Sequence, residues 1–159
     1  MAFDDLNPLG PGDPAPDFTL PNAHGEPVSL RQVVSSRPAV LAFVPAAFTA
    51  TCTGEYCELR DNIALFEDSH VQLIGISVDP KAALRVWGEQ EQLDFPLLSD
   101  FWPHGEVARA FGVFLEERGT ATRATFVVDA TMTIRAAFVN APGEARPISA
   151  YRTAIAALG

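Results

Sequence analysis

The two cysteines of the chain, Cys52 and Cys57, are the side chains best suited to chemistry, and they lie five residues apart. Cys52 follows an apolar run that ends at Pro45, and Thr49 lies three residues before it. A helix-like pattern begins at Cys52. The N–H groups and the dipole at the start of a helix favour an anion, so this position would favour the thiolate, which is the reactive form of cysteine. The alternative for such a loop is a buried, unreactive cysteine.

The composition indicates one folded domain covering residues 1–159, because 48% of the 159 residues are hydrophobic and a chain of this length can bury a substantial core. The net charge is −9 and no basic run is present, which argues against nucleic acid and anionic membranes as partners. The first ten residues lack the basic and apolar regions of a signal peptide. We therefore expect a cytoplasmic protein, in which two cysteines are too few for a disulfide scaffold.

The hydrophobic pattern predicts an α/β fold in which short apolar strands alternate with helices. The predicted strands are residues 18–20, 28–30, 39–44, 71–78, 95–98, 125–129 and 134–139. The predicted helices are residues 30–34, 52–67, 81–91, 103–111 and 148–158, and residues 112–119 are expected to be a connection. Helices between apolar strands imply right-handed crossovers. The result is a central mixed sheet flanked by helices, with an N-terminal β-hairpin.

The spacing of Pro45, Thr49 and Cys52 resembles the active-site signature of the peroxiredoxins, which are thioredoxin-fold peroxidases. The resemblance covers about residues 13–158, and the stretch 99–105 (SDFWPHG) is most similar to the alkyl hydroperoxide reductase E-type branch. It implies a thioredoxin-like fold and reduction of hydrogen peroxide or organic hydroperoxides by Cys52, without a metal or organic cofactor. It also implies a thioredoxin-like, mycoredoxin-like or low-molecular-weight thiol reductant. A homodimer is the family-based expectation, with a monomer, as in many Q-type members, as the alternative.

Two charged residues match further positions of this family. Arg123 resembles the active-site arginine, and Glu55 the carboxylate that orients it. The fixed fork of an arginine can stabilise a thiolate and the charge on a leaving oxygen. The hydroxyl of Thr49 and the N–H groups of Thr51 and Cys52 can hold the peroxide oxygens. The alternatives are a solvated arginine at a strand edge and an acidic residue in the first turn of a helix.

Two apolar residues of the loop complete the candidate site. Pro45 cannot donate an N–H, and its ring can shield one side of the pocket from water. Phe48 can line the pocket mouth and favour apolar hydroperoxides. Ordinary packing is the alternative for Phe48.

Cys57 departs from the E-type pattern and resembles the resolving cysteine of the Q-type peroxiredoxins, also called bacterioferritin comigratory proteins. Five helical residues separate two Cα atoms by about 8.6 Å. A disulfide needs less than about 7 Å, so the helix must unwind if Cys57 is to reach Cys52. The pair Thr53-Gly54 would ease this unwinding. The alternative is a packed helix residue in a one-cysteine enzyme.

Other functions are compatible with two cysteines. The chain could be a non-catalytic redox sensor or relay whose oxidation alters partner binding. A general thiol–disulfide oxidoreductase is disfavoured, because the spacing is C-x4-C rather than C-x-x-C. A structural zinc site is also disfavoured, because such sites usually have four ligands and no histidine lies close to the pair.

Overall fold

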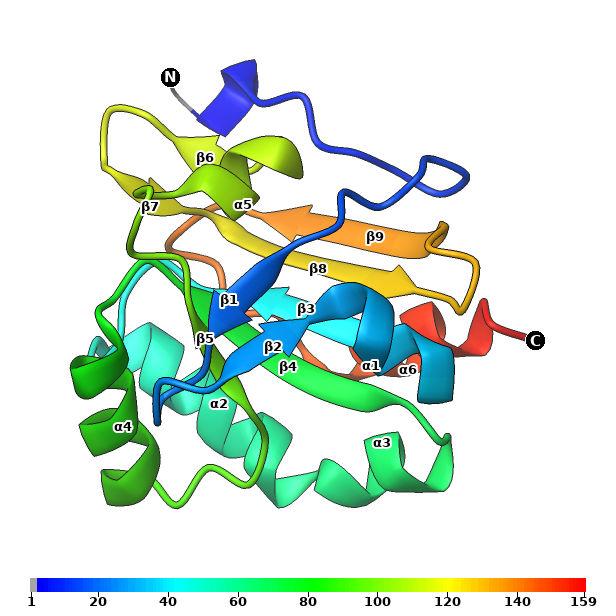
Figure 1. Cartoon of the computed structure of the whole chain (residues 1–159), viewed down its shortest axis with the longest axis horizontal. Helices are drawn as coiled ribbons and strands as arrows, with labels where there is room; N and C mark the ends of the chain where they lie inside the picture. Colours follow the sequence, from blue (N-terminus) through cyan, green and yellow to red (C-terminus); the bar gives the residue numbers. More distant parts are fainter. Residues whose placement is uncertain (1–2) are drawn as a thin grey trace.

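The computed structural model describes residues 3–159, and its centre is a five-stranded mixed sheet with the strand order β5-β4-β3-β8-β9. Strands β3 (Ala39–Phe43), β4 (Gln72–Ser77) and β5 (Leu97–Ser99) are parallel to one another. Strands β8 (Arg123–Val128) and β9 (Ile134–Asn140) are antiparallel to their neighbours. The predicted mixed sheet is confirmed (Figure 1).

The sheet is covered on both faces because its strands alternate their apolar side chains between the two. In β3, Leu41 and Phe43 belong to one core cluster, while Val40 and Ala42 belong to the other. The first face packs against helices α1 (Leu30–Ser36) and α5 (Glu106–Ala110) and the hairpin of β1 (Thr19–Pro21) and β2 (Pro27–Ser29). The second face packs against α2 (Ala50–Asp61), α3 (Ile63–Asp68), α4 (Lys81–Gln90) and α6 (Ile148–Ala156) (Figure 1).

Two predicted helices differ from the observed ones. The helix expected over residues 52–67 is divided at Asn62, whose side chain donates a hydrogen bond to the carbonyl of Glu58 at 2.8 Å. The helix expected over residues 103–111 begins only at Glu106. Gly105 before it has a left-handed conformation (φ 73°), and the Asp100 carboxylate accepts hydrogen bonds from the first turn. These local bonds set the helix start, and the hydrophobic pattern does not report them.

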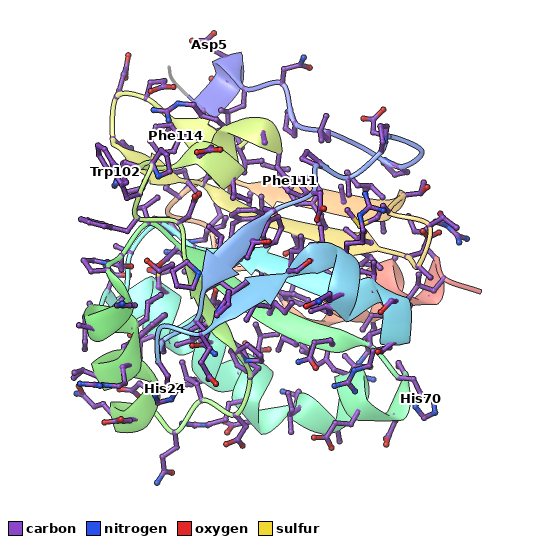
Figure 2. The ribbon with its side chains drawn as sticks, in the orientation of Figure 1. Asp5, His24, His70, Trp102, Phe111 and Phe114 are labelled. Atoms are coloured by element: carbon purple, nitrogen blue, oxygen red, sulfur yellow. The ribbon has the colours of Figure 1, made fainter. Side chains whose placement is uncertain are left out.

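The expected connection over residues 112–119 includes part of a small hairpin of β6 (Phe114–Leu115) and β7 (Thr120–Ala121). Strands of two residues give no periodic signal in the sequence, so this hairpin was not predicted. Nearby Phe111 lies in the interior, where its ring contacts those of Phe43 and Phe126, whereas Trp102 lies at the edge of the molecule and is 80% exposed (Figure 2).

Tyr56 fixes helix α2 to the sheet. Its hydroxyl donates a hydrogen bond of 2.6 Å to the carbonyl oxygen of Ala42 in β3, and its ring stacks on Trp87 of α4 at 5.1 Å. The ring lies directly over Gly75 of β4, where a Cβ atom would be only 2.6 Å from the hydroxyl oxygen. Glycine is therefore required at position 75 for α2 to approach this closely.

We predict that Gly75→Ala lowers the free energy of unfolding by about 1–3 kcal/mol, because the added methyl group displaces the Tyr56 ring. Denaturant unfolding followed by circular dichroism measures the change. Gly54 of α2 is exposed with nothing within 4 Å of an added Cβ. Gly54→Ala should instead raise stability by up to about 1 kcal/mol. An unchanged unfolding midpoint in Gly75→Ala would contradict this packing.

Candidate active site

The loop after β3 places Cys52 as the third residue of α2, and its side chain is fully buried. Thr49 caps the helix: its hydroxyl oxygen accepts a hydrogen bond from the N–H of Cys52 at 3.4 Å and donates one to the carbonyl of Ala46 at 3.1 Å. Thr51 is the second residue of α2, where helix geometry provides no carbonyl partner for the N–H. Pro45 is half-buried at the end of the strand. The predicted strand-to-helix junction is confirmed.

An aspartate outside the predicted site holds this loop. The Asp79 carboxylate accepts hydrogen bonds from the N–H of Ala47 at 2.8 Å and from the hydroxyl of Ser77 at 2.7 Å. The next residue, Phe48, has a left-handed backbone (φ 67°), which is unfavourable for a bulky side chain. Its ring is 51% exposed and lies 6.3 Å from that of Trp87. The loop therefore holds the Phe48 side chain outward, toward solvent. Phe48 lies three residues before Thr51, which is in the first turn of α2.

Glu55 lies one turn after Cys52 and is the centre of a buried charge cluster. Arg123 of β8 donates from Nη1 to Glu55 Oε1 at 2.6 Å and from Nε to the carbonyl of Pro142 at 2.6 Å. Arg146 donates to both carboxylate oxygens, from Nε at 3.0 Å, from Nη2 at 3.1 Å and from its own backbone N–H at 2.5 Å. The predicted pairing of Arg123 with Glu55 is present.

The cluster has two guanidinium groups and one carboxylate, so it carries a surplus positive charge. Burial raises the pKa of Glu55, but hydrogen bonds and charge from Arg146, together with the charge of Arg123, outweigh it and lower the pKa overall. Glu55 is therefore ionised at neutral pH. Within residues 3–159, Nη2 of Arg123 has no protein acceptor, whereas Nε and Nη1 both have one. The arginine fork thus keeps the two N–H groups of Nη2 available for an anion or a ligand.

Arg146 was missed by the sequence reasoning. It lies in the polar loop between β9 and α6, yet it is only 3% exposed, and Nη1 donates to the carbonyl of Ala124 and the hydroxyl of Thr125. Its partner Glu55 is 91 residues away in the sequence. An arginine in the short loop 141–147 (APGEARP) resembles an ordinary surface residue, so the only signal is tertiary contact.

Cys57 does not join this group. Helix α2 is continuous from Ala50 to Asp61, and both cysteines are free thiols. The thiol of Cys57 donates a hydrogen bond to Oε2 of Glu91 at 3.4 Å. Burial raises the pKa of Cys57, and the hydrogen bond to Glu91 raises it further. The structure therefore brings Thr49, Cys52, Glu55 and Arg123 to one end of α2 and directs Cys57 toward α4.

Residues 3–159 contain neither a candidate metal site nor a candidate membrane span. No group of three or more His, Cys, Asp or Glu side chains is placed to hold a metal ion there. No helix in this part of the chain is long and apolar enough to cross a membrane.

Comparison with protein families agrees with this geometry. The model of the family described as "AhpC/TSA family" matches residues 11–137, which is most of the chain and includes the loop, α2 and β8. The chain belongs to the AhpC/TSA family. It is thus a peroxidase of the peroxiredoxin type, and the resemblance seen in the sequence is confirmed.

Individual relatives include both branches that the sequence resembles. Alkyl hydroperoxide reductase E of Mycobacterium tuberculosis is 45% identical over 150 residues, covering 94% of this chain and 98% of the relative. Peroxiredoxin Bcp of Escherichia coli is 41% identical over 112 residues, covering 70% of each chain. The crystal structure of peroxidoxin BcpB from Mycobacterium tuberculosis has a TM-score of 0.83 at 35% identity, covering 94% of this chain and 96% of that one. The thioredoxin-like fold is confirmed.

We predict that Glu55→Gln lowers the free energy of unfolding by about 3–5 kcal/mol at neutral pH, because it leaves Arg123 and Arg146 buried without a counter-charge. Denaturant unfolding of the wild type and the variant measures the difference. Glu58→Gln is the matched control, since Glu58 lies exposed on the same helix. Equal losses in the two variants would contradict the proposed importance of the cluster.

The pH dependence of stability should also differ. The folded-state pKa of Glu55 lies below its ordinary value of 4.5, so the stabilisation is complete above that value and is lost as the pH falls through the folded-state pKa. Wild-type stability should decrease on acidification in this window, and the slope should be smaller in Glu55→Gln. Parallel slopes for wild type and variant would contradict the assignment.

Proposed function

We propose that this chain reduces hydrogen peroxide and organic hydroperoxides through Cys52. The observation that carries the proposal is the position of Cys52 in the first turn of α2. One turn further along this helix, Glu55 holds a buried cluster with surplus positive charge. Both features favour the thiolate. The thiolate attacks one peroxide oxygen, the O–O bond breaks, and the leaving oxygen takes a proton to become water or an alcohol. Cys52 becomes a sulfenic acid.

The proposed roles of the loop follow from its hydrogen bonds. Thr49 presents a hydroxyl, and Thr51 and Cys52 present first-turn N–H groups, which can hold the peroxide oxygens. The free Nη2 of Arg123 can stabilise the charge that develops on the leaving oxygen. Pro45 would shield one side of the site from water. This arrangement needs no metal or organic cofactor.

Three further residues would support the reaction at Cys52. Phe48, which projects from the loop, would form the mouth of the site and favour hydroperoxides with apolar groups. Glu55 would hold Arg123 in orientation through their short contact. Arg146 would support Glu55 in turn, because it occupies both carboxylate oxygens.

We propose that Cys57 resolves the sulfenic acid. A thiolate of Cys57 attacks the Cys52 sulfur, an S–S bond forms, and the S–O bond breaks to release water once the oxygen is protonated. The intact α2 separates the two Cα atoms by about 8.6 Å, beyond disulfide reach, so its first turns must unwind. A one-cysteine cycle with an external thiol is the second candidate. The contact of Cys57 with Glu91, rather than with Cys52, favours it.

A thioredoxin-like, mycoredoxin-like or low-molecular-weight thiol would reduce the oxidised protein, and the cytoplasm would supply it. A homodimer is supported by the exposed apolar side chains of the adjacent residues Phe101 and Trp102. One domain is supported by the single central sheet shared by both core clusters.

We predict that Cys52→Ser lowers steady-state peroxide consumption by roughly a hundredfold or more, because the nucleophile is lost. Cys57→Ser should keep the first oxidation of Cys52 and lose turnover with a dithiol reductant. Peroxide consumption with each reductant measures both effects. Full turnover by Cys57→Ser would establish the one-cysteine cycle, and an active Cys52→Ser would contradict the proposed function.

Stabilising α2 should slow the internal disulfide. Gly54→Ala favours the helix by up to about 1 kcal/mol, so the unwound state becomes about fivefold rarer. Rapid quenching with an alkylating agent and mass spectrometry after peroxide addition gives the rate of disulfide formation. Gly143→Ala is the control, because Gly143 lies outside the helices and has nothing within 4 Å of an added Cβ. Equal rates in the wild type and Gly54→Ala would contradict unwinding of this helix.

A further inference from the structure

One stripe of α2 is tied to the end of α4 by three hydrogen bonds. Trp87 donates from Nε1 to the hydroxyl oxygen of Thr53 at 3.1 Å. Cys57 donates from its thiol to Oε2 of Glu91 at 3.4 Å, and Arg60 donates from Nη1 to the carbonyl oxygen of Glu91 at 2.5 Å. The three α2 residues are spaced by four and three, so they lie on one side of that helix. Two of the three bonds end on Glu91.

The backbone at the end of α4 fixes the place of Glu91. Gln92 has a left-handed conformation (φ 53°), and its N–H donates to the carbonyl of Glu89 at 3.3 Å. The N–H of Leu93 donates to the carbonyl of Gly88 at 2.9 Å. These two bonds form a Schellman motif, which closes the helix in a defined geometry. Glu91, the last residue before the turn, therefore presents its carboxylate and its carbonyl to α2 from a fixed position.

We propose that Glu91 is a latch on Cys57: its carboxylate and carbonyl hold α2 folded and restrain Cys57 from reacting with oxidised Cys52. This inference rests on the proposed resolving role of Cys57. It assigns a positioning role to a residue that lies outside the peroxide-reducing site, at the C-cap of α4, whereas both cysteines lie on α2.

The latch acts first through structure. Disulfide formation requires α2 to unwind, because the intact helix keeps the two cysteines too far apart. Cys57 follows the first turns of α2, and it must leave Glu91 to approach Cys52. The bonds to Glu91 are lost in that movement, so they stabilise the state that cannot react.

The latch acts also through charge. Three charged groups surround the Cys57 thiol: Arg60 and Asp61 from α2, and Glu91 from the end of α4. Arg60 favours the thiolate, but burial, Glu91 and Asp61 oppose it, and the pKa of Cys57 is raised. Since only the thiolate attacks sulfur, the folded state holds Cys57 in its less reactive form. The structural and the electrostatic effects therefore both slow the attack of Cys57 on the Cys52 sulfur.

The opposite role, in which Glu91 removes the proton from Cys57 as a general base, is disfavoured. A carboxylate and a thiol ordinarily differ by about four pKa units, so transfer from the thiol to the carboxylate is uphill. The two groups also separate when α2 unwinds.

The latch sets how the sulfenic acid is used. While Glu91 holds Cys57, an external thiol can attack the Cys52 sulfur instead, giving a mixed disulfide and water. When the latch opens, the thiolate of Cys57 attacks the Cys52 sulfur and forms the internal disulfide. This route also releases one molecule of water. Glu91 thus divides the sulfenic acid between two reducing routes whose products differ.

The experiment compares the wild-type protein with Glu91→Ala and Glu91→Gln. Glu91→Gln removes the charge and keeps an oxygen that can accept from Cys57, whereas Glu91→Ala removes both. After addition of one equivalent of hydrogen peroxide, quenched-flow mass spectrometry measures sulfenic acid and internal disulfide separately. We expect the disulfide to form about two- to tenfold faster in Glu91→Ala, the range expected for one lost hydrogen bond. Glu91→Gln should be intermediate.

A second measurement does not depend on peroxide. In a Cys52→Ser background, iodoacetamide modification of Cys57 should be faster at neutral pH in Glu91→Ala and Glu91→Gln, and its pH profile should shift to lower pH. Glu89→Gln is the matched control, because Glu89 lies exposed on the same helix. It should match the wild type in both measurements.

The outcomes separate this inference from the proposed function. If the wild type and Glu91→Ala form the disulfide at the same rate, the latch is wrong and the resolving role stands. If only Glu91→Ala forms it, the latch is supported. If neither protein forms it, the resolving role and the latch fail together, while loss of activity in Cys52→Ser still establishes the peroxidase. Equal acceleration by Glu89→Gln would also overturn the latch.

Discussion

The arrangement of this site depends on the buried ion pairs between the Glu55 carboxylate and two arginines. The carboxylate joins three segments that are far apart in the sequence: α2, the start of β8 through Arg123, and the loop before α6 through Arg146. A charge removed from water must be paired, and one carboxylate between two guanidinium groups satisfies that requirement with positive charge to spare. The surplus lies within one helical turn of Cys52. The same cluster therefore joins distant parts of the fold and, in the proposed mechanism, places positive charge near the reacting sulfur.

Helix α2 carries two opposing demands. Its N-terminus favours the thiolate of Cys52, which requires the first turn to be folded. A disulfide with Cys57 requires that turn to come apart. The contacts on its sides serve the first demand: Tyr56 anchors it to the sheet across Gly75, and Glu55 anchors it to the arginines. The proposed disulfide would have to overcome this anchoring, and the exposed glycine at position 54 would lower the cost of unwinding.

Much of this could be predicted from the sequence, and the part that could not has a physical explanation. The apolar runs at β3 and β4 identified the buried strands, and the spacing of Pro45, Thr49 and Cys52 identified the junction. Contacts between residues far apart in the sequence could not be predicted. Arg146 looks like a loop residue until the chain folds, and Asp79 until its carboxylate reaches the N–H of Ala47. Helix ends were misplaced where a side chain sets them, as at Asp100 before α5.

Trp87 gives the molecule an internal optical reporter. Its indole is buried, stacked on Tyr56 and hydrogen-bonded to Thr53 of α2, so its surroundings change whenever the first turns of that helix rearrange. The other tryptophan, Trp102, is already 80% exposed and contributes a nearly constant emission. The intensity and wavelength of the fluorescence thus follow the folding state of a single helix. The proposed redox cycle can therefore be followed in time on the unlabelled protein.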